Sequence, residues 1–184
     1  MDITFIKNKK PIIVYVDGSN SKPGKKISDS GVGIVFPNNE FPSISSETKS
    51  AIKFLISDYN FDNFKPTNNI AELIAILSAL FILELSLKKG CHIVIKSDSM
   101  YSINSLTKWY KNWIKNGWVN AQKKPVANKD IIKYLLDKYI IKYKNQIIFQ
   151  HVKAHTSEPP KNSIYYNDWF YNNQADYLSR NYKN

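Results

Sequence analysis

Short apolar runs that end at polar or glycine residues recur along the chain and predict strands. The clearest run, residues 11–16, is rich in β-branched residues and ends at Asp17 and Gly18, so a buried strand is expected at 11–18. A similar run at 92–97 ends at Asp98. Weaker patterns of the same kind predict three further strands, at 31–36, 41–46 and 146–152.

Longer segments with apolar residues at helical spacing lie between and after these runs. Helices are expected at 68–87, from Asp98 onward, from Asn128 onward with a 3.6-residue period, and at 168–180. A capping pattern predicts another helix after Ser46. With one βαβ unit, these elements predict an α/β fold of mixed α+β type, a five-stranded mixed sheet flanked by helices.

Length and charge narrow the class of protein. The 184 residues suit one domain, expected to span 1–184 behind a short tail at 1–10. A net charge of +11 favours a polyanionic partner, such as a nucleic acid. We expect a soluble intracellular monomer, in cytoplasm or nucleus, without a signal peptide, membrane segment or membrane partner. The single Cys91 agrees, because it excludes an internal disulfide.

Four acidic residues stand where a buried acid is costly unless a positive charge holds it: Asp17, Glu72, Asp98 and Asp176. Two follow strands, and Glu72 precedes eleven uncharged residues, 73–83, near the start of a helix. Strand-end aspartates and a helix glutamate can converge at one edge of a sheet. Oxygen ligands of this kind suit magnesium or manganese, so a site for two metal ions is the natural hypothesis.

Each acid also has an ordinary interpretation when taken alone. Asp17 before Gly18 is typical of a turn, and Asp98 could cap the next helix. Glu72 could favour a helix dipole from the first turn, and Asp176 could lie on a solvated helix face. The joint occurrence of the four acids in particular local motifs favours the metal site.

Five segments resemble, in the same order, the motifs of type 1 ribonuclease H: 17–19, 67–73, 97–101, 152–155 and 172–176. Residues 109–130 also resemble the basic handle of that family, and the likeness extends over residues 11–181. The resemblance implies the ribonuclease H-like fold. It also implies a hydrolase, an endonuclease that cuts the RNA strand of RNA/DNA hybrids and leaves 5′-phosphate and 3′-hydroxyl ends.

The resemblance assigns two Mg²⁺ ions to the acids, with Mn²⁺ as a possible substitute. Asp17 would bridge both ions, Glu72 and Asp98 would complete one site, and Asp176 would complete the other. His155 resembles the histidine that positions water or assists product release, although it could also be a strand-end histidine held by backbone.

The same likeness assigns nucleic-acid contacts to eight residues: Asn20, Thr67, Asn68, Asn69, Tyr101, Trp109, Lys124 and Asn128. Asn68 and Asn69 would contact 2′-hydroxyl groups of the RNA strand, the feature that separates RNA from DNA. Thr67 and Asn128 would hold a DNA phosphate, and Asn128 also suits a helix N-cap. Tyr101 and Trp109 would pack on deoxyribose, with ordinary core packing as the alternative.

Three regions depart from the family pattern. Pro23 stands where an asparagine is expected, residues 47–64 suit an insertion, and 156–171 exceed the usual connection after His155. No separate hybrid-binding domain is expected before residue 11, so processivity should be low. Three alternatives stay open: a DNA-acting superfamily member such as a transposase or resolvase, a non-catalytic hybrid-binding module, and a generic basic RNA-binding protein.

Overall fold

The computed structural model describes residues 10–20, 30–38, 41–48, 50–51, 67–154 and 156–183. Three of the expectations above lie wholly or mostly outside these residues: the N-terminal tail, the insertion at 47–64 and His155. The same holds for Pro23 and for most of the helix expected after Ser46.

The predicted five-stranded mixed sheet is confirmed. Its strands are β1 (Ile12–Asn20), β2 (Ser30–Val35), β3 (Ile44–Glu47), β4 (Ile93–Ser97) and β5 (Ile147–His151). They are arranged in the order β3-β2-β1-β4-β5, so β1 is central. Strand β1 pairs with β2 in the antiparallel sense and with β4 in the parallel sense, and β5 runs parallel to β4.

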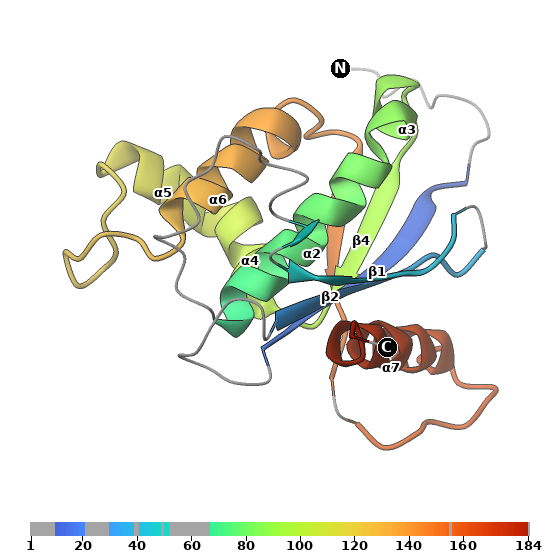
Figure 1. Cartoon of the computed structure of the whole chain (residues 1–184). Helices are drawn as coiled ribbons and strands as arrows, with labels where there is room; N and C mark the ends of the chain where they lie inside the picture. The colour runs from blue at the N-terminus through green and yellow to red at the C-terminus, as the bar shows by residue number, and fades with distance from the viewer. Residues whose placement is uncertain are drawn as a thin grey trace.

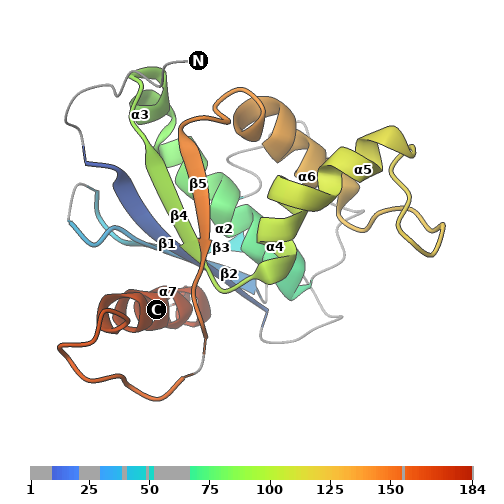
Figure 2. The same ribbon diagram turned by 180° about the vertical axis from the view of Figure 1, so that it is seen from behind.

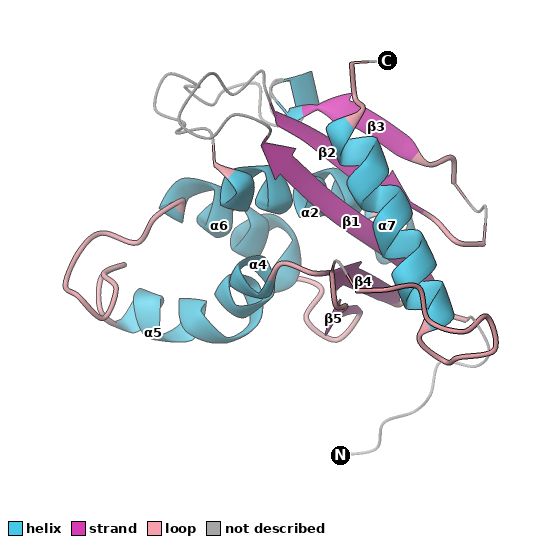
Figure 3. Cartoon of the chain, turned by 90° about the horizontal axis from the view of Figure 1, so that it is seen from below, coloured by secondary structure: helices cyan, strands magenta, loops and turns pink. Residues whose placement is uncertain are grey.

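The helices form layers on both faces of this sheet. They are α2 (Asn68–Ile82), α3 (Glu84–Lys88), α4 (Met100–Asn104), the π-helical turn η3 (Ser105–Trp109), α5 (Tyr110–Lys115), α6 (Lys129–Leu135), the π-helical turn η4 (Leu136–Ile140) and α7 (Tyr166–Arg180). Helix α2 crosses one face beside α4 and α6, and among the described residues α7 is the helix that covers the other face (Figures 1 and 3). Helix α5 and the segment after it extend away from the sheet (Figure 2).

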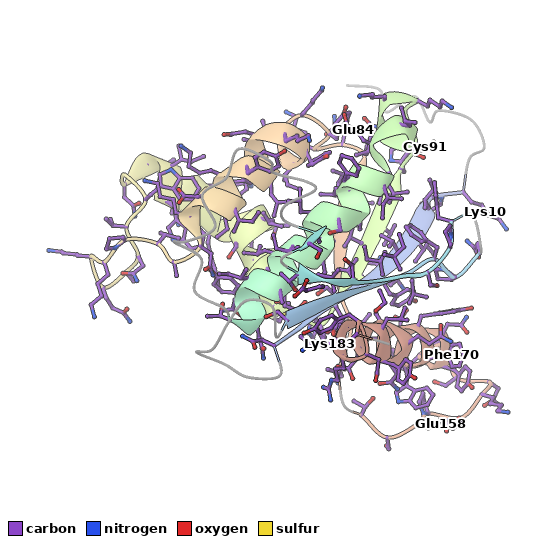
Figure 4. All side chains as sticks on the ribbon, viewed as in Figure 1. Lys10, Glu84, Cys91, Glu158, Phe170 and Lys183 are labelled. Atoms are coloured by element: carbon purple, nitrogen blue, oxygen red, sulfur yellow. The ribbon has the colours of Figure 1, made fainter. Side chains whose placement is uncertain are left out.

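Helix α2 is the centre of the core. Every residue from Ile70 to Leu80 is buried, because the sheet covers one side of the helix and the helical layer covers the other. This uncharged apolar segment is therefore the most buried of the described helices, as its lack of charge predicts. Side chains fill the space between α2 and the sheet (Figure 4). None of the described helices is both long and apolar enough to cross a membrane.

Several predicted ends move by one or more residues. The helix expected at 68–87 is interrupted at Leu83, whose N–H still donates to Ala79 O before α3 begins. Strand β3 begins at Ile44 rather than residue 41, and α7 begins at Tyr166 rather than residue 168. Strand β1 continues to Asn20, so residues expected to form a closing turn are in the sheet.

Helix α7 lies very close to strands β1, β2 and β3. A Cβ atom added at Gly33 would stand 2.0 Å from Ala175 O, so only glycine permits this approach. Hydroxyl groups of the sheet then bind the last carbonyls of the helix: Ser45 Oγ donates to Leu178 O at 2.6 Å, and Ser19 Oγ donates to Ser179 O at 2.7 Å. The C-terminal end of α7 is thereby fixed beside β1.

The N-terminal end of α7 is held by a second set of contacts. Asp168 Oδ1 accepts hydrogen bonds from Lys96 Nζ at 2.5 Å and from the Tyr15 hydroxyl at 2.6 Å. Lys96 also lies over the Tyr15 ring, 5.3 Å from its centroid. Burial, reinforced by the hydrogen bond to Asp168, raises the pKa of the Tyr15 phenol, which therefore stays protonated and donates.

Candidate active site

One pocket at the end of the sheet is lined by residues from β1, α2, α7 and the turn after β4. They are Asp17, Gly18, Ser19, Asn20, Asn68, Glu72, Asp98, Asp176 and Arg180. All four acidic residues singled out in the sequence thus reach the same pocket, although 159 positions separate Asp17 from Asp176 in the chain.

Strand register and helix packing bring three of the acids together. Tyr15 pairs with Lys96 across the parallel strands β1 and β4, so Asp17 and Asp98, each two residues further on, emerge at the same edge. Glu72 reaches the same edge from α2, the helix that lies against one face of the sheet. One carboxylate oxygen from each of Asp17, Glu72 and Asp98 lies within 4.8 Å of the others.

The carboxylates of this trio are in an unfavourable electrostatic setting. Asp17 is 4% exposed and Glu72 is 9% exposed. Burial raises the pKa of Asp17 to about 6; the Ser179 hydroxyl acts in the opposite direction, and the charges of Asp98 and Asp176 raise the pKa further. Burial, together with the neighbouring Asp17 and Asp98, also raises the pKa of Glu72 well above its ordinary value.

The donor set fits a hard divalent cation. Glu72 Oε2 is buried without a hydrogen-bond partner among the described residues. Its neighbours in the trio are carboxylate oxygens of the same sign of charge, which repel unless a cation lies between them. Oxygen-only ligands are the ones that magnesium and manganese prefer. These observations support the metal site predicted from the sequence.

For three of the acids, the structure contradicts the alternative roles of turn residue, first-turn acid and helix cap. Asp17 lies within β1 opposite Gly33 rather than in a turn. Glu72 lies beyond the first turn of α2, which begins at Asn68 and contains no acid, so a first-turn dipole role is excluded. The cap of α4 is Ser99, whose side chain accepts from Ser102 N, so Asp98 is not needed for that purpose.

Asp176 stands apart from the trio. It lines the pocket from the last turns of α7, where Arg180 Nε approaches its Oδ1 at 2.8 Å. Arg180 is the only arginine of the chain and the only cation among the described residues that line the pocket. The structure therefore brings three carboxylates into one cluster and leaves the fourth beside it, paired with a guanidinium.

Three polar residues stand at the start of α2, and one of them, Asn68, lines this pocket. Thr67, Asn68 and Asn69 are exposed, and the Thr67 hydroxyl accepts from Ile70 N at 3.3 Å as the N-cap. Asn68 Oδ1 accepts from Asn20 N at 3.0 Å, which joins the start of the helix to the end of β1. Asn20, predicted from the family likeness, is buried in the pocket wall.

A second surface combines the predicted aromatic and amide residues. Asn128 has a φ of +58° at the N-cap position of α6, but its side chain makes no capping hydrogen bond with the described residues. Asn128 thus occupies the predicted N-cap position, while its side-chain amide donates to the Tyr101 hydroxyl at 3.0 Å. The ring centroids of Tyr101 and Trp109 are 6.1 Å apart, and Trp109 is 40% exposed, which disfavours ordinary core packing for Trp109.

The aromatic surface continues beyond the predicted pair. Trp113 lies 5.8 Å from Trp109 and 6.1 Å from Trp118, measured between ring centroids. Lys124 is exposed on the following segment, where its N–H donates to Asn120 Oδ1. The short isolated pairing of Val119 with Pro125 closes this segment into a compact loop.

Two residues of the site were missed by sequence reasoning, Ser179 and Arg180. Ser179 Oγ donates to Asp17 Oδ2 at 2.5 Å, and Arg180 pairs with Asp176 as described. A signal was available, because residues three and four positions after an acid share its face of a helix. That signal shows that they lie near Asp176 but gives no indication that Ser179 reaches Asp17.

Comparison with known proteins points to the same family as the sequence motifs do. The family model described as RNase H matches residues 9–182. A probable ribonuclease H of Acanthamoeba polyphaga mimivirus is 35% identical over 85% of this chain and 59% of its own length, so the chain spans somewhat more than half of that relative. The ribonuclease H of Clostridium botulinum is 34% identical over 92% of this chain and 93% of its own.

A solved structure shares the fold. The foamy viral protease-reverse transcriptase, determined in complex with an RNA/DNA hybrid, superposes with a TM-score of 0.59 at 24% identity. The match covers 97% of this chain and 21% of that one, so a single part of the larger protein corresponds to the whole fold described above.

Proposed function

Because the chain belongs to the ribonuclease H family, we propose that it is an endonuclease that hydrolyses the RNA strand of RNA/DNA hybrids. The observation that carries this proposal is the trio of Asp17, Glu72 and Asp98, with oxygens within 4.8 Å of one another in a pocket that Asp176 also lines. A buried cluster of acids lowers the stability of the fold, so its presence favours a functional role. A metal-dependent reaction is such a role, because the bound cations would offset the repulsion between the carboxylates.

The four carboxylates would hold two divalent cations, with Mg²⁺ as the proposed ion. Bound there, the ions would lower the pKa of an attacking water and stabilise the leaving 3′ oxygen of the scissile phosphate. Asp17 is proposed for the position shared by both ions because it is on the central strand of the sheet. The proposed products carry 5′-phosphate and 3′-hydroxyl ends.

Substrate selection is assigned to residues beside this centre. Asn68 and Asn69 are exposed next to the pocket, where amide groups can contact the 2′-hydroxyl that distinguishes RNA from DNA. Asn20 would support them, since its N–H fixes the Asn68 side chain. His155, whose proposed role is to assist water positioning or product release, lies outside the described residues.

The DNA strand is assigned to the second surface. Tyr101 and Trp109 offer ring faces for deoxyribose, and Asn128 of the same surface offers a polar group for a phosphate. Thr67, at the start of α2, would contribute to the same phosphate contact. Lys124 and the neighbouring lysines would add sequence-independent attraction to the backbone. We expect little sequence preference, because lysine neutralises phosphate as a point charge without the bidentate geometry of arginine.

The direct test is cleavage of a labelled RNA strand in an RNA/DNA hybrid, with and without Mg²⁺. Single-stranded RNA, duplex RNA and duplex DNA serve as alternative substrates. Asp98→Asn should abolish cutting, whereas Asp137→Asn, which neutralises an exposed acid on η4, should cut like the wild type. Hybrid-only, Mg²⁺-dependent cutting is the expected result.

Two other outcomes would reject the proposal and point elsewhere. Tight hybrid binding without cutting would indicate a non-catalytic hybrid-binding module. Cutting of duplex DNA would indicate a DNA-acting enzyme of the transposase or resolvase type.

A further inference from the structure

The last turn of α7 carries a buried hydroxyl that points at the candidate active site. Ser179 is fully buried, and its Oγ lies 2.5 Å from Asp17 Oδ2 and 2.9 Å from Asp176 O. A hydroxyl has one hydrogen to donate. The shorter distance and the charge of the acceptor both favour Asp17, because hydrogen bonds to carboxylates are shorter and stronger than those to neutral oxygens.

This contact depends on an unusual approach of the helix to the sheet. A Cβ atom at Gly31 would stand 2.0 Å from Ser179 O, and one at Gly33 would stand 2.8 Å from Ser179 N. The two glycines of β2 therefore let the helix backbone at residue 179 rest directly on the strands. A larger residue at either position would move Ser179 away from Asp17.

The attachment of α7 to the sheet does not by itself explain why residue 179 carries a hydroxyl group. Ser45 Oγ already binds Leu178 O, and Ser19 Oγ already binds Ser179 O. Both of those hydroxyls satisfy helix carbonyls, which is what fixing the end of a helix requires. The hydrogen bond of the Ser179 hydroxyl has the opposite direction, because the helix donates and the strand accepts. Its acceptor is the Asp17 carboxylate, which is buried among other acids.

We propose that Ser179 is a positioning residue for Asp17, which it holds in the orientation required to bind the divalent cation. The inference rests on the proposed function, because it takes Asp17 to be a metal ligand. Hydrogen bonds to metal-binding carboxylates fix the ligand before the ion arrives, and removing such a bond commonly costs about 10- to 100-fold in metal affinity or activity.

The test compares Ser179→Ala with Ser45→Ala. Each change removes one hydroxyl that joins α7 to the sheet, but only the first hydroxyl reaches a carboxylate. Mg²⁺ binding is measured by calorimetry on the protein alone, thermal melting is followed in EDTA, and hybrid cleavage is followed over a range of Mg²⁺ concentrations. Ser179→Thr keeps a hydroxyl and serves as the rescue variant.

Ser179→Ala should bind Mg²⁺ about tenfold more weakly or worse, and its half-maximal rate should need correspondingly more Mg²⁺. Its kcat at saturating Mg²⁺ should stay within about threefold of the wild type, Ser45→Ala should bind Mg²⁺ normally, and Ser179→Thr should recover affinity. Should Ser179→Ala fail to fold, Ser179→Cys, with a thiol of similar size that donates weakly, makes the same comparison.

The inference is overturned if Ser179→Ala folds and binds Mg²⁺ like the wild type, or if Ser45→Ala weakens binding to the same degree. In both cases wild-type cleavage of the hybrid persists, so the proposed function survives. A wild-type protein that neither binds Mg²⁺ nor cuts the hybrid would overturn the proposed function and this inference together.

Discussion

Gly18 of β1 lies directly against the backbone of Ala71 in α2, so that a Cβ atom at residue 18 would stand 2.1 Å from the carbonyl carbon of Ala71. The same atom would stand 2.2 Å from Glu72 N. The distance between Asp17 and Glu72 thus depends on a glycine, because only a residue without a side chain lets the helix approach the strand this closely.

Gly18→Ala should therefore separate α2 from β1 and disrupt the carboxylate trio. Because the obstructing atoms are backbone, we expect the free energy of unfolding to fall by about 2–3 kcal/mol and Mg²⁺ binding to disappear. Gly90→Ala is the control: nothing lies within 4 Å of its added Cβ, so only the strain of its φ of +80°, about 1–2 kcal/mol, should appear. Denaturant unfolding and calorimetry with Mg²⁺ measure both effects. Unchanged Mg²⁺ binding in Gly18→Ala would contradict this account.

The stability of the metal-free protein should fall as the pH rises through the acid range. The pKa of Asp17 is raised from 3.8 to about 6, so the folded state holds a proton that the unfolded state releases. The corresponding stability is present below pH 3.8 and lost as the pH rises through 6, an effect of at most about 3 kcal/mol. Glu72, with its pKa also raised, acts in the same direction.

Asp17→Asn isolates this effect, because the amide does not titrate. In EDTA, its melting temperature relative to the wild type should be higher at pH 7 than at pH 4. Addition of Mg²⁺ at pH 7 should raise the melting temperature of the wild type and not that of the variant. A difference that stays constant or shrinks with rising pH would show that Asp17 is not the buried acid described above.

The pair between Lys96 and Asp168 should matter more for stability than an exposed pair. The Lys96 side chain is 14% exposed, so Asp168→Asn leaves a largely buried ammonium facing a neutral group, at a cost of about 1–3 kcal/mol. Lys88→Met breaks the exposed pair with Glu84, where the Lys88 side chain is 52% exposed, and should destabilise the protein much less than Asp168→Asn does. Urea unfolding of both variants measures the contrast. Equal destabilisation by the two variants would mean that the pair between Lys96 and Asp168 contributes no more to stability than an exposed ion pair does.

The lysines of α5 and the loop after it should govern hybrid affinity without governing the chemical step. Four of them are exposed: Lys111, Lys115, Lys123 and Lys124. Their replacement by glutamine should weaken binding to hybrids of any sequence. The slope of log affinity against log salt concentration should become shallower by about 0.9 for each phosphate that is no longer neutralised. At saturating substrate, kcat should be unchanged.

The matched control neutralises Lys142 and Lys144, two exposed lysines in the turn before β5. Fluorescence anisotropy with a labelled hybrid in the Asp98→Asn background gives the affinity without cleavage. Because the control removes two charges and the test removes four, the comparison is made per charge. Equal weakening per charge would assign the attraction to overall charge rather than to the α5 region.

Much of the fold could be read from local patterns. The run 11–16 and the run 92–97 form β1 and β4, and the uncharged stretch after Glu72 lies in α2, the most buried helix in the described part of the chain. These predictions succeeded because strand and helix formation follow the spacing of apolar residues, which is a property of neighbouring positions. The places where they failed are element ends, such as Leu83 and Ser99, where hydrogen bonds with atoms a turn away decide the boundary.

The sequence by itself determined which acids belong to the candidate site, because motif order and the cost of a buried carboxylate are both visible in it. The i,i+4 spacing on one helix face also made the pairing of Asp176 with Arg180 accessible from sequence, but not the hydrogen bond that Ser179 donates to a carboxylate 162 positions away. That hydrogen bond depends on how closely α7 rests on the glycines of β2. Tertiary packing sets that approach, because contacts between segments far apart in the chain depend on the shapes of both surfaces at once and not on the pattern within either one.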